Sequence, residues 1–173
     1  MNSDEVKFQG IAGEDAVTEE IHVAARPERV FKALTDQGEL VRWFTCTTGP
    51  VHQWEMEARV GGRYRYFISQ EAASANGVQA FECHGEILEF DPPRLLEYTW
   101  IADWHADKQR GTVVRWELVE DATGTHVKVT HSGLASEHLA RKDYRGGWTG
   151  VVKMLKSFLE KATDDSPAKY ELK

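Results

Sequence analysis

The sequence has little cysteine, no long apolar run and a minority of positive charge. Its two cysteines, Cys46 and Cys83, are too few for a disulfide framework, so we expect two reduced thiols. No stretch reaches the roughly 18 apolar residues of a membrane-spanning helix, and the first residues lack the pattern of a signal peptide. These absences predict a cytoplasmic protein with no membrane partner.

Basic residues are outnumbered, with 21 Lys and Arg against 28 Asp and Glu, for a net charge of −7. A nucleic-acid-binding protein needs a basic surface, so we expect no nucleic-acid partner.

Motifs for metal binding and for nucleophilic catalysis are missing too. The chain has no CxxC, HExxH or GxSxG motif, and Gly61-Gly62 is not followed by the Lys-Ser/Thr of a phosphate loop. Cys83 and His84 are adjacent, but successive residues of a strand point to opposite faces and cannot bind one ion together. We expect no metal, no cofactor and no catalytic residue.

Tryptophan is abundant, with six residues in a chain of 173. Large rings fill or line cavities, which favours an apolar pocket. The length predicts one domain, which we place at residues 16–162, with a loose leader at 1–15 and a polar tail at 163–173.

A long amphipathic helix is predicted over Tyr144–Lys161, with Asp143 as its N-cap. One face carries its apolar side chains, which are Tyr144, Trp148, Val151, Val152, Leu155, Phe158 and Leu159. Lys156 falls on the opposite, solvent side. Gly146 and Gly147 would lie in the first turn, where each costs about 1 kcal/mol relative to alanine. Either a ligand or another backbone comes close there, or the first turn frays.

The rest of the chain reads as one strand, two short helices and then a series of strands. The first strand is predicted at Val17–Ala24, and the helices begin at Pro27 and Gly38. Residues 52–132 alternate with period two, broken by a turn or bulge at Gly61-Gly62 and by a turn over Ala72–Val78.

This order of elements predicts an α+β fold, because no βαβ unit occurs. We expect a helix-grip arrangement, in which a curved antiparallel sheet of about six to seven strands wraps around the long C-terminal helix. Two short helices follow the first strand.

Four stretches resemble a known family. They are ARPERVFKALTDQGELVRWF, RVGGRYRYFI, HGEILEFDPPRLLEYTW, and GTHVKVTHSGL followed by GGW. In this order they resemble the START-like, or SRPBCC, superfamily, and more closely the domain named for the C-terminal part of the activator of heat-shock-protein-90 ATPase. The resemblance implies the helix-grip fold. The family implies several functions, which include ligand carriers, polyketide cyclases and chaperone activators.

Strand phase and the helix stripe place a set of rings on the concave side, and we predict that these bind a ligand. The predicted ligand-binding residues are Trp54, Tyr66, Trp100, Trp116, His131 and Trp148. His131 could orient a polar group of the ligand, although a core histidine bonded within the protein is the favoured interpretation. The opposite phase predicts solvent exposure for Glu86, Glu89, Glu97, Glu117, Arg63 and Arg65.

Three functions follow as hypotheses. The first is a binding protein for a small apolar or aromatic molecule, held between sheet and helix. The second is a stress-linked co-chaperone that contacts a chaperone through its outer surface. The third is a cyclase- or aromatase-like enzyme acting in the same cavity, which the lack of an acid–base pair disfavours.

Overall fold

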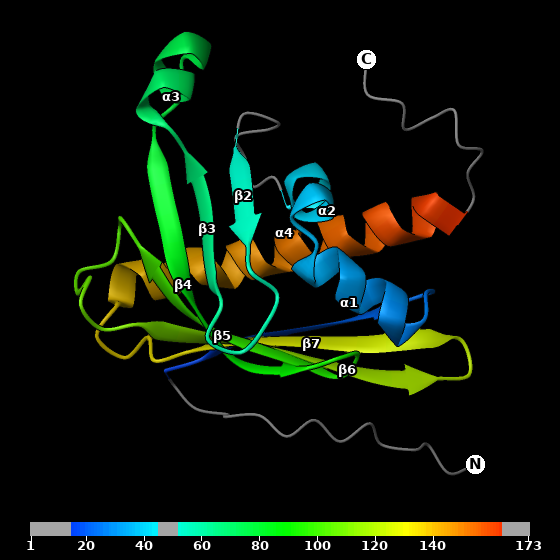
Figure 1. The fold of residues 1–173 in the computed structure, drawn as a ribbon. Helices are drawn as coiled ribbons and strands as arrows, with labels where there is room; N and C mark the ends of the chain where they lie inside the picture. The colour runs from blue at the N-terminus through cyan, green and yellow to red at the C-terminus, as the bar shows by residue number, and fades with distance from the viewer. Residues whose placement is uncertain (1–14, 45–51, 164–173) are drawn as a thin grey trace.

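The computed structural model describes residues 15–44 and 52–163, which form seven strands and four helices (Figure 1). The strands are β1 (Val17–Val23), β2 (Gln53–Met56), β3 (Arg63–Ile68), β4 (Phe81–Asp91), β5 (Leu95–Ala102), β6 (Thr112–Asp121) and β7 (Gly124–Ser132). The helices are α1 (Pro27–Thr35), α2 (Gln37–Trp43), α3 (Gln70–Asn76) and α4 (His138–Thr163).

All seven strands form one antiparallel sheet in the order β1-β7-β6-β5-β4-β3-β2. Strands β2 to β4 bend away from β5 to β7, so the sheet curves around α4, while α1 and α2 pack on the same side (Figure 1). The core lies between this concave face and α4. The predicted helix-grip fold is therefore confirmed. No helix among the described residues is long and apolar enough to cross a membrane.

Helix α4 carries the apolar stripe into the core, but it begins six residues earlier than predicted. Asp143 lies inside the helix and is not its N-cap. Ala140 and Tyr144 are both buried and one turn apart, so they extend the stripe toward the N-terminus. Gly146 and Gly147 consequently lie about two turns inside the helix, and the interpretation of a fraying first turn is wrong.

The predicted turn over Ala72–Val78 is wrong as well, because helix α3 occupies most of it. The Ser69 hydroxyl oxygen accepts a hydrogen bond from the backbone N–H of Ala72, which caps the helix start. Gly77 ends the helix with a φ of 66°. A helix C-terminus and a hairpin turn both need a residue with left-handed backbone angles, so Asn76-Gly77 fits either. Here it forms the helix C-terminus.

The Gly61-Gly62 break is a turn between β2 and β3, as predicted. Gly61 has a φ of 77°, which favours glycine. A Cβ atom at Gly62 would lie 2.0 Å from the carbonyl oxygen of Glu57.

The convex face is mainly charged, as its phase predicts, but two of the glutamates are covered, since the side chain of Glu97 is only 17% exposed. Glu86 and Glu89 are exposed, but Glu117 is only 7% exposed. Arg115 covers it, forming ion pairs of 3.4 Å with Glu117 and 2.9 Å with Glu97. The prediction that Glu117 faces water is wrong because this arginine shields it.

The structure describes Cys83, but neither Cys46 nor the two ends of the chain. Cys83 is buried in the core and His84 is exposed, so they lie on opposite faces as predicted. Cys46, residues 1–14 of the expected leader and residues 164–173 of the expected tail lie outside the described residues.

Candidate functional site

An apolar cleft of about 320 Å³ lies between α4 and the concave face of the sheet. Strands β3 and β5 supply one wall and the glycine-containing part of α4 supplies the other. The residues that line it are Phe44, Tyr66, Trp100, Trp104, Tyr144, Gly146, Gly147, Trp148, Gly150, Val151 and Met154. The lining carries no charged side chain, so the cleft suits an uncharged, apolar molecule.

Three glycines of α4 form one wall of the cleft. A Cβ atom added at Gly146, Gly147 or Gly150 would meet no atom within 4 Å. Close packing therefore does not require glycine at these positions, although each costs about 1 kcal/mol relative to alanine inside a helix. All three are exposed to solvent, so they leave the cleft open on this side of the aromatic rings.

The Tyr144 hydroxyl joins three polar side-chain groups beside the cleft. It accepts hydrogen bonds from the indole Nε1 atoms of Trp100 at 3.1 Å and Trp104 at 3.0 Å. Its own proton is then available for Nε2 of His105, 2.6 Å away. Burial lowers the pKa of His105 and raises the pKa of Tyr144, so both groups are neutral at pH 7. All polar capacity of the hydroxyl is used inside the protein.

The connection between β5 and β6 is held in place by Glu137, the residue before α4. Its buried carboxylate accepts hydrogen bonds from the backbone N–H groups of Ala106 at 2.8 Å and Asp107 at 2.9 Å. These bonds fix Trp104 and His105 against the start of α4. Trp104 is 47% exposed and lies at the rim of the cleft.

The six predicted ligand-binding residues separate into two groups. Tyr66, Trp100 and Trp148 line the cleft directly. Trp54 and Trp116 lie behind them: the Trp54 ring stacks on Tyr66 with centroids 4.7 Å apart, and the Trp116 ring lies 5.8 Å from that of Trp148.

His131, the sixth predicted residue, is buried behind the cleft in a chain of hydrogen bonds. Nδ1 accepts from Nε1 of Trp148 at 3.1 Å, and Nε2 donates to the Thr112 hydroxyl at 2.7 Å. That hydroxyl donates to the carbonyl oxygen of Trp100 at 2.6 Å. Both ring nitrogens are satisfied, which fits the favoured interpretation of a core histidine that positions two cleft tryptophans.

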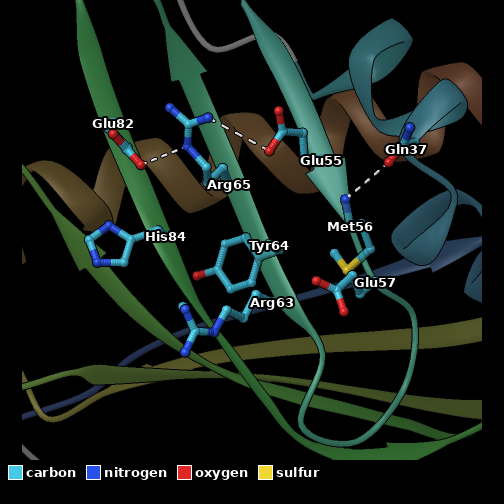
Figure 2. A pocket seen from close by; sticks show the side chains of 10 residues that line it. Gln37, Glu55, Met56, Glu57, Arg63, Tyr64, Arg65, Glu82 and His84 are labelled. Carbon is cyan, nitrogen blue, oxygen red and sulfur yellow. Dashed lines mark hydrogen bonds and ion pairs between the residues drawn. The ribbon is translucent and has the colours of Figure 1, made fainter.

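A second hollow, of about 520 Å³, lies on the convex face over β2 to β4 (Figure 2). Figure 2 shows α4 behind the sheet and Arg65 between two glutamates, 2.7 Å from Glu82 and 3.7 Å from Glu55. Arg65 lies on the outer face, as predicted. These charges pair with one another at the surface, so the larger hollow is a weaker candidate than the apolar cleft.

The comparison with protein-family models decides the family. Residues 24–160 match the model described as activator of Hsp90 ATPase homolog 1-like protein. The chain belongs to this family. The resemblance drawn from the four sequence stretches is confirmed, and the matched range covers both walls of the cleft. No curated protein matches the chain in sequence.

Solved structures of bacterial proteins share the fold. Protein MLL2253 from Mesorhizobium loti is 26% identical, with a TM-score of 0.66 over 84% of this chain and 97% of its own. Protein NE0264 from Nitrosomonas europaea is 18% identical, with a TM-score of 0.70 over 90% of this chain and 100% of its own. CalU16 from Micromonospora echinospora is 21% identical, with a TM-score of 0.61 over 89% of this chain and 78% of its own.

Several residues at the cleft were not predicted as site residues from the sequence. Trp104 and His105 lie in a charged connection without strand period, and only the tertiary bonds to Tyr144 bring them to the site. Tyr144 was predicted as a member of the apolar stripe only, so the hydrogen bonds of its hydroxyl were not predicted. Gly146 and Gly147 did carry a signal, and a close approach of a ligand or another backbone was one of the two interpretations given for them.

The buried His131 should make stability depend on pH. Burial, and to a smaller extent the nearby His105, lower the pKa of His131 to about 3 in the folded protein. In the unfolded chain a histidine takes up a proton below about pH 6.5. The contribution of neutral His131 to stability is therefore fully present above that pH. It is lost, by about 1.4 kcal/mol per pH unit, as the pH falls toward the folded pKa.

A comparison with His131→Gln isolates this effect. The variant should be less stable at pH 7, and the difference in free energy of unfolding from wild type should shrink between pH 6 and 4. Urea denaturation of both proteins at several pH values measures this difference. The carboxylates and the other histidines are the same in both proteins, so their effects on stability cancel. Parallel curves would show that His131 is not held neutral.

Proposed function

We propose that the protein binds a small apolar or aromatic molecule in the cleft between α4 and strands β3 and β5. The observation that carries this proposal is the wall formed by Gly146, Gly147 and Gly150, which leaves open space against aromatic rings without any packing need. Burial of the ligand surface drives binding, at roughly 25 cal/mol per Å² of apolar area.

The cleft volume supports a small ligand. Binding pockets for drug-sized molecules span about 300–1,000 Å³, and a cleft of about 320 Å³ is at the lower end of that range. The hydroxyl of Tyr144 and the indoles of Trp100 and Trp148 are bonded to protein atoms. A ligand with a strongly polar end would have to break these bonds, so an apolar or aromatic compound is favoured.

The two other hypotheses have less support from the site. A co-chaperone would act through the outer surface, and the cleft would then have no role. For an enzyme, DynU16, described as a protein in the dynemicin biosynthetic locus, shares the fold at a TM-score of 0.65 and 20% identity over 87% of this chain and 49% of its own. This similarity supports the fold alone. Cytoplasmic location also remains a prediction.

Filling the glycine wall tests the proposal. In Gly147→Leu and Gly150→Leu the new side chains extend into the open space, and leucine favours a helix over glycine by about 1 kcal/mol. We expect thermal stability to be kept or raised, while the affinity for an apolar naphthalene-based fluorescent probe falls at least tenfold, about 1.4 kcal/mol. Fluorescence titration measures the affinity.

Lys153→Leu is the matched control, because Lys153 is exposed on the same helix and does not line the cleft. It adds the same apolar side chain to α4 and should leave probe affinity unchanged. Equal probe affinity in wild type and both glycine variants would refute the proposal and favour the outer-surface hypothesis.

A further inference from the structure

Three metal-ligating side chains from distant parts of the chain meet on the convex face of the sheet. His22 of β1 and His126 of β7 are direct partners in the antiparallel register. Asp121 ends β6, two residues after Val119, which pairs with His126. Directly opposed and diagonal residues on one face are close enough for their side chains to meet. Register alone therefore gathers two imidazoles and one carboxylate.

The ligand atoms lie near the spacing that a metal ion requires. One ligand atom from each residue lies within 4.8 Å of the others. Oδ2 of Asp121 is 3.2 Å from Nε2 of His22 and 2.7 Å from Nε2 of His126. Ligands about 2.0–2.1 Å from a tetrahedral zinc ion are separated by about 3.3 Å, so small side-chain rotations would admit the ion.

Neighbouring groups orient the carboxylate. Oδ1 of Asp121 accepts hydrogen bonds from the backbone N–H of Thr123 at 2.8 Å and from its hydroxyl at 3.0 Å. These bonds hold the carboxylate so that Oδ2 lies beside both imidazoles, while Nε2 of His22 is also 3.3 Å from Oδ1 and 3.0 Å from the Thr123 hydroxyl. Hydrogen bonds that orient a ligating carboxylate in this way are typical of metal sites.

We propose that His22, Asp121 and His126 form a binding site for a divalent transition-metal ion, with zinc as the best match. Imidazole and carboxylate ligands suit Zn²⁺, Ni²⁺, Cu²⁺ and Fe²⁺, and the set contains no thiolate that would favour a softer ion. The side chains are 33%, 29% and 38% exposed, which leaves room for solvent or a small molecule as a further ligand. Three protein ligands and an open position are the arrangement of reactive metal sites.

This site is separate from the cleft. Its residues lie at and beside the β6–β7 hairpin with the phase of the convex face, whereas the cleft borders residues 144–154 of α4 on the concave side. Because the two sites are separate, this proposal does not depend on the proposed ligand function. A bound ion would join β1 to the β6–β7 hairpin. Nothing in the linear sequence indicates it, because the ligands come from positions 22, 121 and 126 and match no spacing motif.

Titration of the chelator-treated protein with Zn²⁺, followed by calorimetry, tests the proposal. We expect one saturable site per chain, and Co²⁺ should give the visible absorption of a low-coordinate nitrogen and oxygen site. Affinity should fall more than about tenfold in His22→Ala, His126→Ala and Asp121→Asn. The control His84→Ala removes an exposed histidine elsewhere on the convex face and should bind like wild type.

Two results would overturn the proposal. One is the absence of saturable binding in wild type, and the other is unchanged affinity in His22→Ala and His126→Ala. Circular dichroism verifies the fold of each variant. Asp121→Asn keeps the size and the Thr123 contacts of the native side chain, so it decides the matter if an alanine variant fails to fold.

Discussion

Replacing Leu155 by alanine should lower the free energy of unfolding by about 2–5 kcal/mol. Leu155 is 0% exposed and lies in the middle of the apolar stripe of α4, which the sheet wraps. The substitution removes buried methyl groups and leaves a cavity that the surrounding sheet cannot close. Chemical denaturation monitored by tryptophan fluorescence measures the change.

Lys153→Ala is the control on the same helix, and it should change stability by less than about 0.5 kcal/mol. Lys156, assigned to the solvent side from the sequence, is not suitable. Its Nζ atom is 2.8 Å from the carbonyl oxygen of His22 and 2.7 Å from Glu160. If Leu155→Ala were as mild as Lys153→Ala, α4 would not be the core element of the fold.

Replacing Trp100 by alanine should also cause a large loss of stability. The direction of the change in probe affinity distinguishes a ligand-binding cleft from a filled core. Its ring lines the cleft, and its Nε1 atom donates to the Tyr144 hydroxyl. Loss of the ring should destabilise the fold by about 3–5 kcal/mol. If the cleft binds a ligand, the loss of aromatic contact should also weaken probe binding. If the rings only fill a core, the new cavity should create binding.

Trp100→Phe and Trp116→Phe form a milder matched pair. Trp116 donates its indole N–H to the hydroxyl of Tyr98 at 2.9 Å, as Trp100 does to Tyr144 at 3.1 Å, but Trp116 does not line the cleft. Each substitution should cost about 1–3 kcal/mol of stability. Only Trp100→Phe should alter probe affinity. A stronger probe interaction in Trp100→Ala than in wild type would contradict the cleft hypothesis.

The strand phases could be predicted from the sequence because they depend on local alternation. Tyr66 follows Arg65 and Trp100 follows Thr99 in their strands, and both rings face the cleft. Strand phase could not distinguish residues that line the cleft from residues buried behind them, such as Trp116. That distinction depends on how α4 packs across the sheet. The core role of His131 was favoured in advance, since a buried ring with two nitrogens needs partners.

Errors arose where a short segment had two possible structures. Asn76-Gly77 fits both a hairpin turn and a helix end, and the Ser69 cap decided for the helix. The start of α4 was placed too late, because Ala140 is the only small apolar signal before Tyr144 on that face. The hydrogen bonds of Tyr144 and the cluster around Asp121 depend on tertiary contacts, which no local pattern encodes.

Nuclear magnetic resonance of the indole N–H groups tests the ligand-binding cleft most directly. The protein contains six tryptophans, each with one indole signal, so ¹⁵N-labelled protein titrated with the naphthalene-based probe reports on six positions at once. We predict saturable shifts for the three tryptophans that line the cleft, which are Trp100, Trp104 and Trp148. The signals of Trp43, Trp54 and Trp116 should move less. Unchanged signals from the three cleft tryptophans at saturating probe would contradict the account.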